Sequence, residues 1–404
     1  MKLLAALAAS AALLSATGPA QAQTVGVTDT SIKIGNINPY SGPASSYGVI
    51  GKTLVAYFKA VDAAGGITSK DGKTRRVDFI SVDDGYSPPR TVEQARKLVE
   101  DDQVAFLFQV LGTPTNSAIH KYMNAKKVPQ LFVATGASKW GQPKKYPWTI
   151  GFQPTYDVEG EIYAKHVMTS VENPKIAILY QNDDSGKDYR DGFLRGLGPE
   201  GQKSVVASMP YEVTDPTVDA QILQLASSNA NAFFVAGVPK FVAQALRKAC
   251  EIGWHPLRMI SNTSSSVSAT LKPAGLDCST GVLTAQWMKD PNDPQWKGSD
   301  GYKEWLAFMD TNIPDGDKGD VNYVYGYNVA KLLDVMLTNC ADLSRPGIMA
   351  CAANLNHVEL PMLLPGITVQ TSPTDFYPIQ AEQLSRFDGH KWELFGPVID
   401  AGSK

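Results

Sequence analysis

The residues of this chain that could do chemistry by themselves are few and scattered. The five histidines stand far apart and form no His-Glu-x-x-His pattern, and no two cysteines have the spacing of zinc ligands. Ser264-Ser265-Ser266 lacks the glycines that bracket a hydrolase nucleophile. The sequence therefore predicts neither a metal site nor a catalytic nucleophile, and we expect a protein that is not an enzyme.

Two patterns that would bind a nucleotide are also incomplete. Gly51-Lys52-Thr53 ends like a phosphate-binding loop, but the position five residues before Gly51, where that motif has a glycine, is Ser46. No Gly-x-Gly-x-x-Gly follows an expected strand. The acid pairs Asp83-Asp84 and Asp183-Asp184 fall where strands end and fit solvated turns. We therefore expect no cofactor.

Small and hydroxylated residues follow two expected strands. Leu111–Asn116 comes after the strand 105–110, and Ala134–Ser138 comes after the strand 130–133. Ligands of open parallel sheets bind beyond the carboxyl ends of the strands, and free N–H groups at a helix start suit a carboxylate. Thr113 and Pro114 are candidate ligand residues in the first of these loops. The alternative is simple capping of a helix that begins at Asn116, and capping and binding can coexist.

Several tyrosines fall in expected loops or at helix starts, where a ring with a polar tip can form the wall of a cleft. They are Tyr47, Tyr86, Tyr323 and Tyr325. Packing in the core or at its rim is the alternative for each of them alone.

The elements that must position these residues alternate in type along the chain. Short apolar runs rich in β-branched residues (32–37, 77–82, 105–110, 130–133, 175–180, 232–236, 259–260) alternate with amphipathic helices (50–64, 88–100, 116–125, 159–169, 189–197, 218–227, 241–252). This alternation predicts βαβ units with parallel sheets, arranged as two similar α/β lobes. In the last hundred residues we expect helices at 302–309 and 327–337 and a strand hairpin at 380–387 and 392–398.

The composition of the 404-residue chain limits the function further. Lys and Arg number 37 against 40 acidic residues, which gives a net charge of -3. No excess of basic residues is present to attract nucleic acid or an anionic membrane. The hydrophobic content of 43% is sufficient for sizeable cores, which argues against disorder over most of the length.

The N-terminus has the features of a secretory signal. Lys2 precedes an apolar run over 3–14, and Ala20-Gln21-Ala22 is a small-x-small site that predicts cleavage after Ala22. An apolar helix retained in a cytoplasmic protein is the alternative. Four cysteines are too few for a disulfide scaffold. Cys340 could pair with Cys351 and Cys250 with Cys278, but buried free thiols explain them equally well.

The order of several short motifs resembles one family, the periplasmic solute-binding proteins of branched-chain amino acid ABC transporters, of the leucine-isoleucine-valine-binding type. The motifs are Lys33-Ile34-Gly35, Ser41-Gly42-Pro43-Ala44 through Tyr47-Gly48, Val61–Ile67, Asp83-Asp84, and Tyr180–Lys187. The resemblance covers essentially the whole mature chain. Asp62 stands where the family more often has an asparagine.

The resemblance implies a type I periplasmic binding fold, in which two doubly wound, Rossmann-like lobes are joined by a three-strand hinge and close on a solute. Crossings are expected near 148–153, 283–288 and 363–369. The implied division is a signal peptide over 1–22, a first lobe over 23–150 and 286–365, and a second lobe over 151–285 and 366–404. The implied partners are a small carboxylate ligand and an inner-membrane permease with its ATPases, and the implied form is a monomer in the periplasm.

The family's ligand positions transfer onto particular residues of this chain. Thr113 matches the hydroxyl that receives the ligand carboxylate, Ala134 and Gly136 match the next contacts, and Tyr47 matches an aromatic wall. On the second lobe the matches are Ser185 and Thr263; Tyr325 is added as a further aromatic candidate. Amino-acid binders of this type hold the ligand ammonium with an aromatic hydroxyl and an acid at the positions of Ser185 and Thr263, and a buried ammonium without such partners is costly.

These departures lead to the hypothesis of a small organic acid without an α-amino group, and the tyrosines favour an aromatic one. The alternatives are an amino acid, carried by the same class of transporter, and a ligand-sensing receptor with the same fold.

Overall fold

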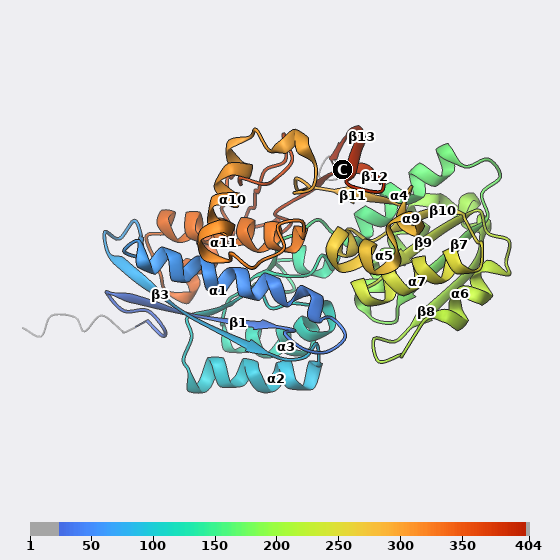
Figure 1. Cartoon of the computed structure of the whole chain (residues 1–404). Coiled ribbons are helices and arrows are strands. Elements are labelled where there is room, and N and C mark those ends of the chain that lie inside the picture. The colour runs from blue at the N-terminus through green and yellow to red at the C-terminus, as the bar shows by residue number, and fades with distance from the viewer. Residues whose placement is uncertain (1–23, 401–404) are drawn as a thin grey trace, which may run out of the picture.

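The computed structural model describes residues 24–400, so the expected signal peptide and its cleavage site lie outside the described residues. Two mixed α/β lobes stand side by side, one at the left of Figure 1 and one at the right. Each is built on one sheet with helices on both faces, as the alternation of elements predicts.

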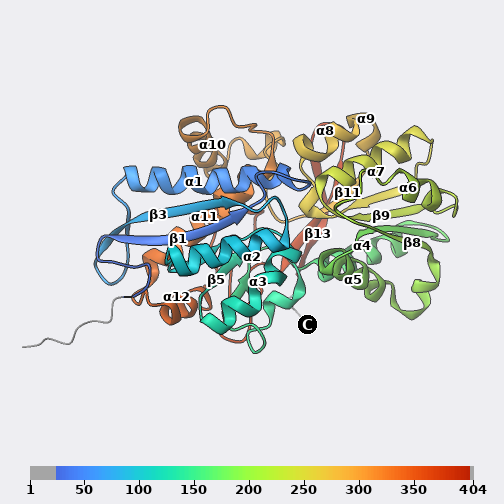
Figure 2. The ribbon, with the colours of Figure 1, turned by 90° about the horizontal axis from the view of Figure 1, so that it is seen from below.

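The first lobe combines the N-terminal part of the chain with a later group of helices. In both Figure 1 and Figure 2 the orange helices lie with the blue and cyan elements. Its elements are β1 (Ser31–Asn38), α1 (Gly48–Ala63), β2 (Ile67–Thr68), β3 (Thr74–Asp83), α2 (Pro88–Arg96), β4 (Phe106–Phe108), α3 (Thr113–Lys126), β5 (Gln130–Val133), β6 (Thr149–Gly151), α10 (Asp300–Asn312), α11 (Val321–Asn339) and α12 (Arg345–Ala352).

The first sheet has the strand order β2-β3-β1-β4-β5-β6, and all of its pairings except β2 with β3 are parallel. In α1 the residues Ile50, Leu54, Tyr57 and Phe58 are buried at helical spacing. Leu131, Phe132 and the rest of β5 are entirely buried, as expected for a strand covered on both faces. These rigid elements fix where the loops that follow β4 and β5 emerge.

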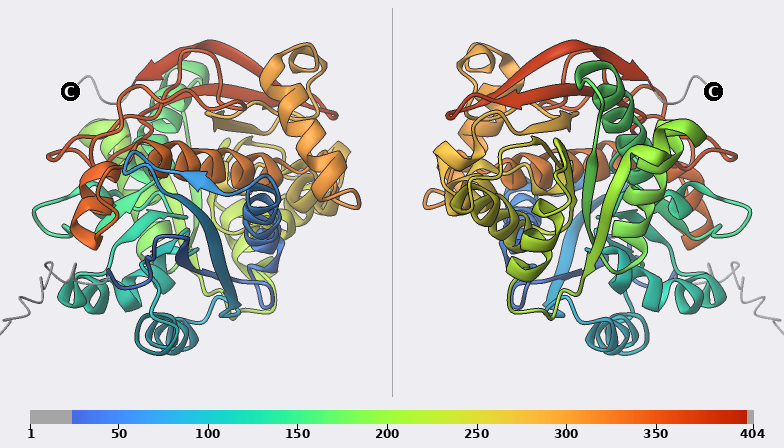
Figure 3. Two further views of the ribbon diagram at one scale, coloured as in Figure 1. Left: turned by 90° about the vertical axis from the view of Figure 1, so that its left-hand side faces the viewer. Right: turned by 90° about the vertical axis from the view of Figure 1, so that its right-hand side faces the viewer.

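The second lobe is an internal segment completed by the end of the chain. Its elements are α4 (Tyr156–Ser170), β7 (Ile176–Gln181), α5 (Asp184–Gly201), β8 (Val205–Tyr211), α6 (Asp219–Ala226), β9 (Ala232–Ala236), α7 (Pro239–Glu251), β10 (Leu257–Ile260), α8 (Lys272–Ala274), α9 (Leu276–Ser279), β11 (Leu283–Gln286), β12 (Ala381–Phe387) and β13 (Trp392–Asp400). The sheet order is β13-β12-β11-β10-β9-β7-β8, parallel from β11 to β8 and antiparallel in the last two strands. Figure 3 shows the red β12–β13 hairpin lying across one edge.

Three passages of the chain connect the lobes. The first follows β6 and leads into α4, and the second follows β11, where the Leu364 N–H donates to the Trp287 carbonyl at 3.0 Å. The third differs from the expected position at 363–369. That stretch turns at Gly366, whose φ is +84°, and Val369 then pairs with Val358.

The chain therefore remains with the first lobe for several residues more than expected. The Thr371 hydroxyl still donates to the Ala352 carbonyl at 2.7 Å, and the second sheet is reached only at Ala381. These contacts follow from the Pro-Gly turn, which reverses an apolar stretch that reads as a crossing strand; the division of the chain at 366 stays a prediction.

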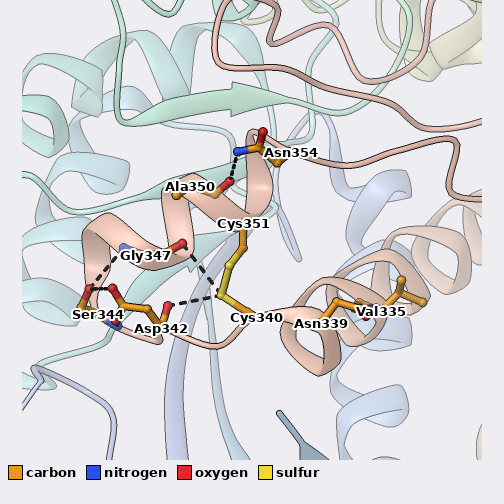
Figure 4. Close-up of a disulfide and its surroundings, with 9 residues drawn as sticks. All are labelled: Val335, Asn339, Cys340, Asp342, Ser344, Gly347, Ala350, Cys351 and Asn354. Atoms are coloured by element: carbon orange, nitrogen blue, oxygen red, sulfur yellow. Dashed lines mark hydrogen bonds between the residues drawn. A yellow bond between two sulfur atoms is a disulfide. The ribbon is translucent and has the colours of Figure 1, made fainter. Parts of the chain in front are cut away.

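All four cysteines are paired, as Cys250–Cys278 and Cys340–Cys351, with Cα–Cα distances of 5.5 and 5.7 Å. Figure 4 shows the second bond, which fastens α12 to the end of α11. Ser344 caps α12 through the Gly347 N–H, and Arg345 then donates from its guanidinium to the Val104 and Ala105 carbonyls of the first sheet.

Candidate functional site

A cavity lies between the two lobes. The first lobe contributes residues from the loops after β3, β4 and β5 and from the starts of α1 and α11. The second contributes the starts of α5 and α7 and the loop after β10, and the first two passages line the cavity between them. Within residues 24–400, the side chains that line it include no Asp, Glu, Lys, Arg or His.

The structure brings six of the eight expected ligand residues together around this cavity. They are Tyr47, Thr113, Ala134, Ser185, Thr263 and Tyr325. Pro114 and Gly136 are not among the lining residues; Pro114 belongs to the first turn of α3. A Cβ on Gly136 would stand 2.7 Å from the Tyr156 ring and 2.3 Å from the Pro154 carbonyl oxygen. Gly136 therefore provides the space in which Tyr156 reaches the cavity wall.

The start of α3 presents an uncapped helix terminus to the cavity. Gly112 has a φ of +103°, and a Cβ there would stand 2.5 Å from the ring of Tyr86. No side chain caps α3, and its first turn contains no acidic residue. The positive end of the helix dipole is therefore free to attract an anion. The helix begins at Thr113, three residues before the expected start at Asn116.

Two further polar groups accompany this helix terminus on the first lobe. The Thr113 and Thr135 hydroxyl oxygens are 2.5 Å apart, so the two hydroxyls share a hydrogen bond. The Nδ2 of Asn322, at the start of α11, is buried and has no protein acceptor. A buried amide N–H without an acceptor is costly, so this donor is suited to an acceptor on a ligand.

The corresponding groups of the second lobe are already engaged with the protein. Asp183 caps α5 by accepting from the N–H groups of Ser185 at 2.9 Å and Gly186 at 3.2 Å. It also accepts the Ser185 hydroxyl proton and a proton of the Gln181 amide. At the start of α7 the Val238 N–H donates to the Tyr211 hydroxyl at 3.2 Å.

A buried carboxyl group, Glu159 of α4, stands directly behind this part of the wall. It accepts the Tyr163 hydroxyl at 2.6 Å, the Asn262 N–H at 2.6 Å and the Tyr189 hydroxyl at 2.9 Å. Burial raises the pKa of Glu159 to about 7. Asn262 and Tyr189 both line the cavity, so Glu159 fixes the positions of two wall residues without reaching the cavity itself.

Aromatic rings form much of the remaining wall. The Tyr156 and Tyr189 rings are stacked, with centroids 4.3 Å apart and planes at 20°. The Trp287 and Tyr325 rings meet edge to face at 5.9 Å and both pack against Phe152. With Tyr47 and Tyr86, six aromatic side chains line the cavity. Such walls suit a flat apolar ligand body.

Direct contacts between the lobes show that this is a closed arrangement. The Tyr47 hydroxyl donates to the Thr263 carbonyl at 3.0 Å. Outside the cavity, the Ser138 N–H and hydroxyl donate to the Asp188 carboxyl of α5 at 2.7 and 2.8 Å, and Lys139 pairs with Asp184 at 2.7 Å. We call these four residues, Ser138, Lys139, Asp184 and Asp188, the interlobe latch.

Sequence reasoning missed several lining residues, among them Tyr156, Tyr189, Trp287, Asn262 and Asn322. Trp287 belongs to the expected crossing at 283–288, which was a usable signal for it, and Tyr156 lies three residues after the expected crossing at 148–153. Asn262 lies beside the predicted Thr263. Tyr189 and Asn322 fall inside or at the start of helices and carry no local signal.

Two absences hold for the described part of the chain. No helix within residues 24–400 is long and apolar enough for a bilayer crossing. Nor does this range hold a group of three or more His, Cys, Asp or Glu side chains placed as metal ligands.

Two lobes that close over a cavity with a polar end and aromatic walls define a solute-binding protein. The chain belongs to the periplasmic binding protein family, whose model matches residues 31–389. The protein is therefore a binding protein and not an enzyme. No curated protein sequence matches it.

Solved structures share the fold at low sequence identity. A possible leucine/isoleucine/valine-binding protein from Rhodopirellula baltica SH 1 is 20% identical with a TM-score of 0.78, over 93% of this chain and 98% of that chain. A fatty acid ABC transporter substrate-binding protein from Thermomonospora curvata is 19% identical with a TM-score of 0.74, over 94% and 95%. A solute binding protein of an ABC transporter from Rhodopseudomonas palustris BisB5, in complex with 3,4-dihydroxy benzoic acid, is 19% identical with a TM-score of 0.74, over 93% and 98%. These likenesses confirm the two-lobed type I fold.

Proposed function

We propose that this protein is the periplasmic solute-binding component of an ABC importer, and that its solute is a small aromatic carboxylate without an α-amino group. The observation that carries the proposal is the composition of the cavity wall. Six aromatic side chains surround a space with no charged lining residue, and the uncapped start of α3 faces it. Two of the structural neighbours are described as ABC transporter proteins, one of them holding 3,4-dihydroxy benzoic acid.

The start of α3 is the proposed place for the carboxylate. Its dipole and N–H groups favour an anion, and the Thr113 hydroxyl and Asn322 Nδ2 supply further donors from the same lobe. The starts of α5 and α11 carry the acidic caps Asp183 and Asp320. These caps offset the dipoles of their own helices. The starts of α1 and α7 also lack a side-chain cap, but the Gly48 N–H at α1 donates to the Ser45 carbonyl and the Val238 N–H at α7 donates to the Tyr211 hydroxyl. The start of α3, with Thr113 and Asn322 beside it, is therefore the proposed anion site.

Binding then follows from closure of the lobes. A solute seated on the first lobe gains contacts with the second lobe only when the two meet, so its presence shifts the population toward the closed arrangement. The permease of the importer is the proposed partner that recognises this arrangement, and the protein acts as a monomer after removal of residues 1–22.

An amino acid is the second candidate solute, and one observation favours it. Asp183 and Glu159 each stand one hydrogen bond behind the wall, at Ser185 and Tyr189. Such carboxylates lower the cost of placing an ammonium group at that wall.

Calorimetric titration of the mature protein tests the proposal. The protein is unfolded and refolded with its disulfides intact, to remove carried solute, and is titrated with benzoate- and cinnamate-like acids and with leucine, valine and phenylalanine. We expect micromolar binding, about -8 kcal/mol, for an aromatic acid and none for leucine. Binding of leucine with no response to aromatic acids overturns the proposed solute class and leaves the second candidate.

A further inference from the structure

The polar groups of the cavity differ in kind between its two ends. On the first lobe they are donors without protein acceptors: the uncapped start of α3 and the Nδ2 of Asn322. On the second lobe, Gln181, Ser185 and Tyr189 donate protons to carboxyl groups of the protein. This difference between the two ends of the cavity indicates which kind of group the solute carries opposite its carboxylate.

Ser185 shows the effect most clearly. Its hydroxyl has one proton, which it donates to the Asp183 carboxylate, so only oxygen lone pairs remain for a partner in the cavity. Asp183 is itself held in place by the N–H groups of Ser185 and Gly186. If the Ser185 hydroxyl turned its proton toward the cavity, the Asp183 carboxylate would lose one of its hydrogen-bond donors.

Two neighbouring side chains of the cavity wall also donate their protons to the protein. The Gln181 amide donates to Asp183, and the Tyr189 hydroxyl donates to Glu159 at 2.9 Å. The backbone N–H of Val238 is engaged by the Tyr211 hydroxyl at 3.2 Å. The part of the second lobe around Ser185 therefore offers mainly acceptors, and a ligand group that only accepts hydrogen bonds finds few donors beside this residue.

We infer that the bound solute carries a hydrogen-bond donor, a hydroxyl group on its ring, at the end opposite its carboxylate, and that Ser185 recognises this donor. The inference rests on the proposed function, because it takes the carboxylate to lie at α3. The physical basis of the selection is that a methyl ether at the same ring position presents no proton, so it covers the lone pairs of the Ser185 oxygen without donating a hydrogen bond to them.

The test compares matched ligands on matched variants. Benzoate, the three hydroxybenzoate isomers and their methoxy counterparts are titrated into the refolded protein, into Ser185→Ala, and into Ser185→Thr, which retains a hydroxyl. The readout is the dissociation constant of each methoxy acid divided by that of its hydroxy counterpart. A ratio within one protein is insensitive to a general loss of affinity.

We expect one hydroxy isomer to bind wild type at least about 10-fold more tightly than its methoxy counterpart and than benzoate. Ser185→Ala should reduce the ratio about 5-fold, and Ser185→Thr should keep most of it. Equal binding of hydroxy and methoxy acids by wild type, or a ratio unchanged in Ser185→Ala, overturns the inference while the proposed function stands. Absence of binding by every aromatic acid overturns both.

Discussion

Tyr47 connects the two lobes through one hydroxyl proton, donated to the Thr263 carbonyl. Tyr47→Phe removes this hydrogen bond and keeps the ring. Because the bond exists only in the closed arrangement, we expect ligand affinity to fall about 5-fold, the value of one net hydrogen bond near 1 kcal/mol, with little loss of thermal stability. Tyr57→Phe is the matched control, since the Tyr57 hydroxyl donates to Asp334 within the first lobe. Equal effects of the two variants on affinity would contradict the prediction.

Gly136 affects the cavity wall through the Tyr156 ring beside it. In Gly136→Ala the new Cβ would stand 2.7 Å from Tyr156, so the ring must shift out of its stack with Tyr189. We expect a loss of ligand affinity of about 10-fold or more, because the displaced ring belongs to the cavity wall. Isothermal titration gives the affinity. Gly298→Ala, where no atom lies within 4 Å of the added Cβ, is the control and should bind like wild type.

The sequence predicted individual site residues where a loop motif marked them. Thr113, Ala134 and Ser185 follow strands and lie at the cavity for that reason. Tyr189 and Asn322 could not be predicted, because whether a helical residue faces a cleft depends on how the helix packs against the other lobe.

The interlobe latch joins the loop after β5 to helix α5 and makes closure dependent on pH. Burial in the closed arrangement raises the pKa of Asp188 to about 6, with Asp157 contributing repulsion and Arg195 and the Ser138 donors opposing the rise. Separation of the lobes removes Ser138 from Asp188, and we expect the pKa of Asp188 then to return toward 3.8. Closure therefore takes up a proton between about pH 4 and pH 6.

It follows that acidification in this window strengthens closure, and that raising the pH through 6 removes the gain. We expect ligand affinity to increase as the pH falls from 7 to 5, and proton uptake on binding to appear as a buffer-dependent heat in calorimetry. Asp188→Asn should abolish both. The titrations use a ligand that is fully ionised over this pH range. If the affinity of wild type decreased on acidification, Asp188 of the interlobe latch would be excluded as the source of the pH dependence.

Helix α12 depends on the Cys340–Cys351 bond. The two cysteines are 11 residues apart, and closing a loop of this size in the unfolded chain is worth about 2–3 kcal/mol. The double variant Cys340→Ser, Cys351→Ser should lower the melting temperature measurably. Ligand affinity should remain within about 2-fold, because neither cysteine lines the cavity. Thermal unfolding and titration of one preparation provide both readings, and a large loss of affinity would contradict the separation of the two regions.

Most elements could be predicted from their periodicity, including the C-terminal hairpin. Strand β8 was missed, because its alternation of half-buried and exposed residues is weak and Pro210 interrupts it. The disulfides were left open, since pairing depends on distances that only the fold supplies.

For the whole molecule, closure predicts a change in size. The refolded, ligand-free protein should populate a more open form in solution, and its radius of gyration from small-angle scattering should decrease when ligand is added. Tyr47→Phe should require more ligand for the same decrease. A radius that does not change between the ligand-free and saturated states would mean that the lobes remain closed without solute.

The two-lobed architecture was predictable because alternating elements repeat twice along the chain. The third passage was misplaced, since the Pro365-Gly366 turn hides a reversal inside an apolar stretch. The extra residues of the first lobe between 366 and 371 follow from that turn.

The nesting of one lobe inside the other has a consequence for biosynthesis. Strand β11 pairs on its outer side only with β12, which is nearly a hundred residues later in the chain. Until the last hairpin has emerged from the ribosome, the apolar edge at Leu283–Gln286 has no neighbour and is open to mispairing with other chains. A nascent chain that stops before Ala381 should therefore be a substrate for chaperones and proteases.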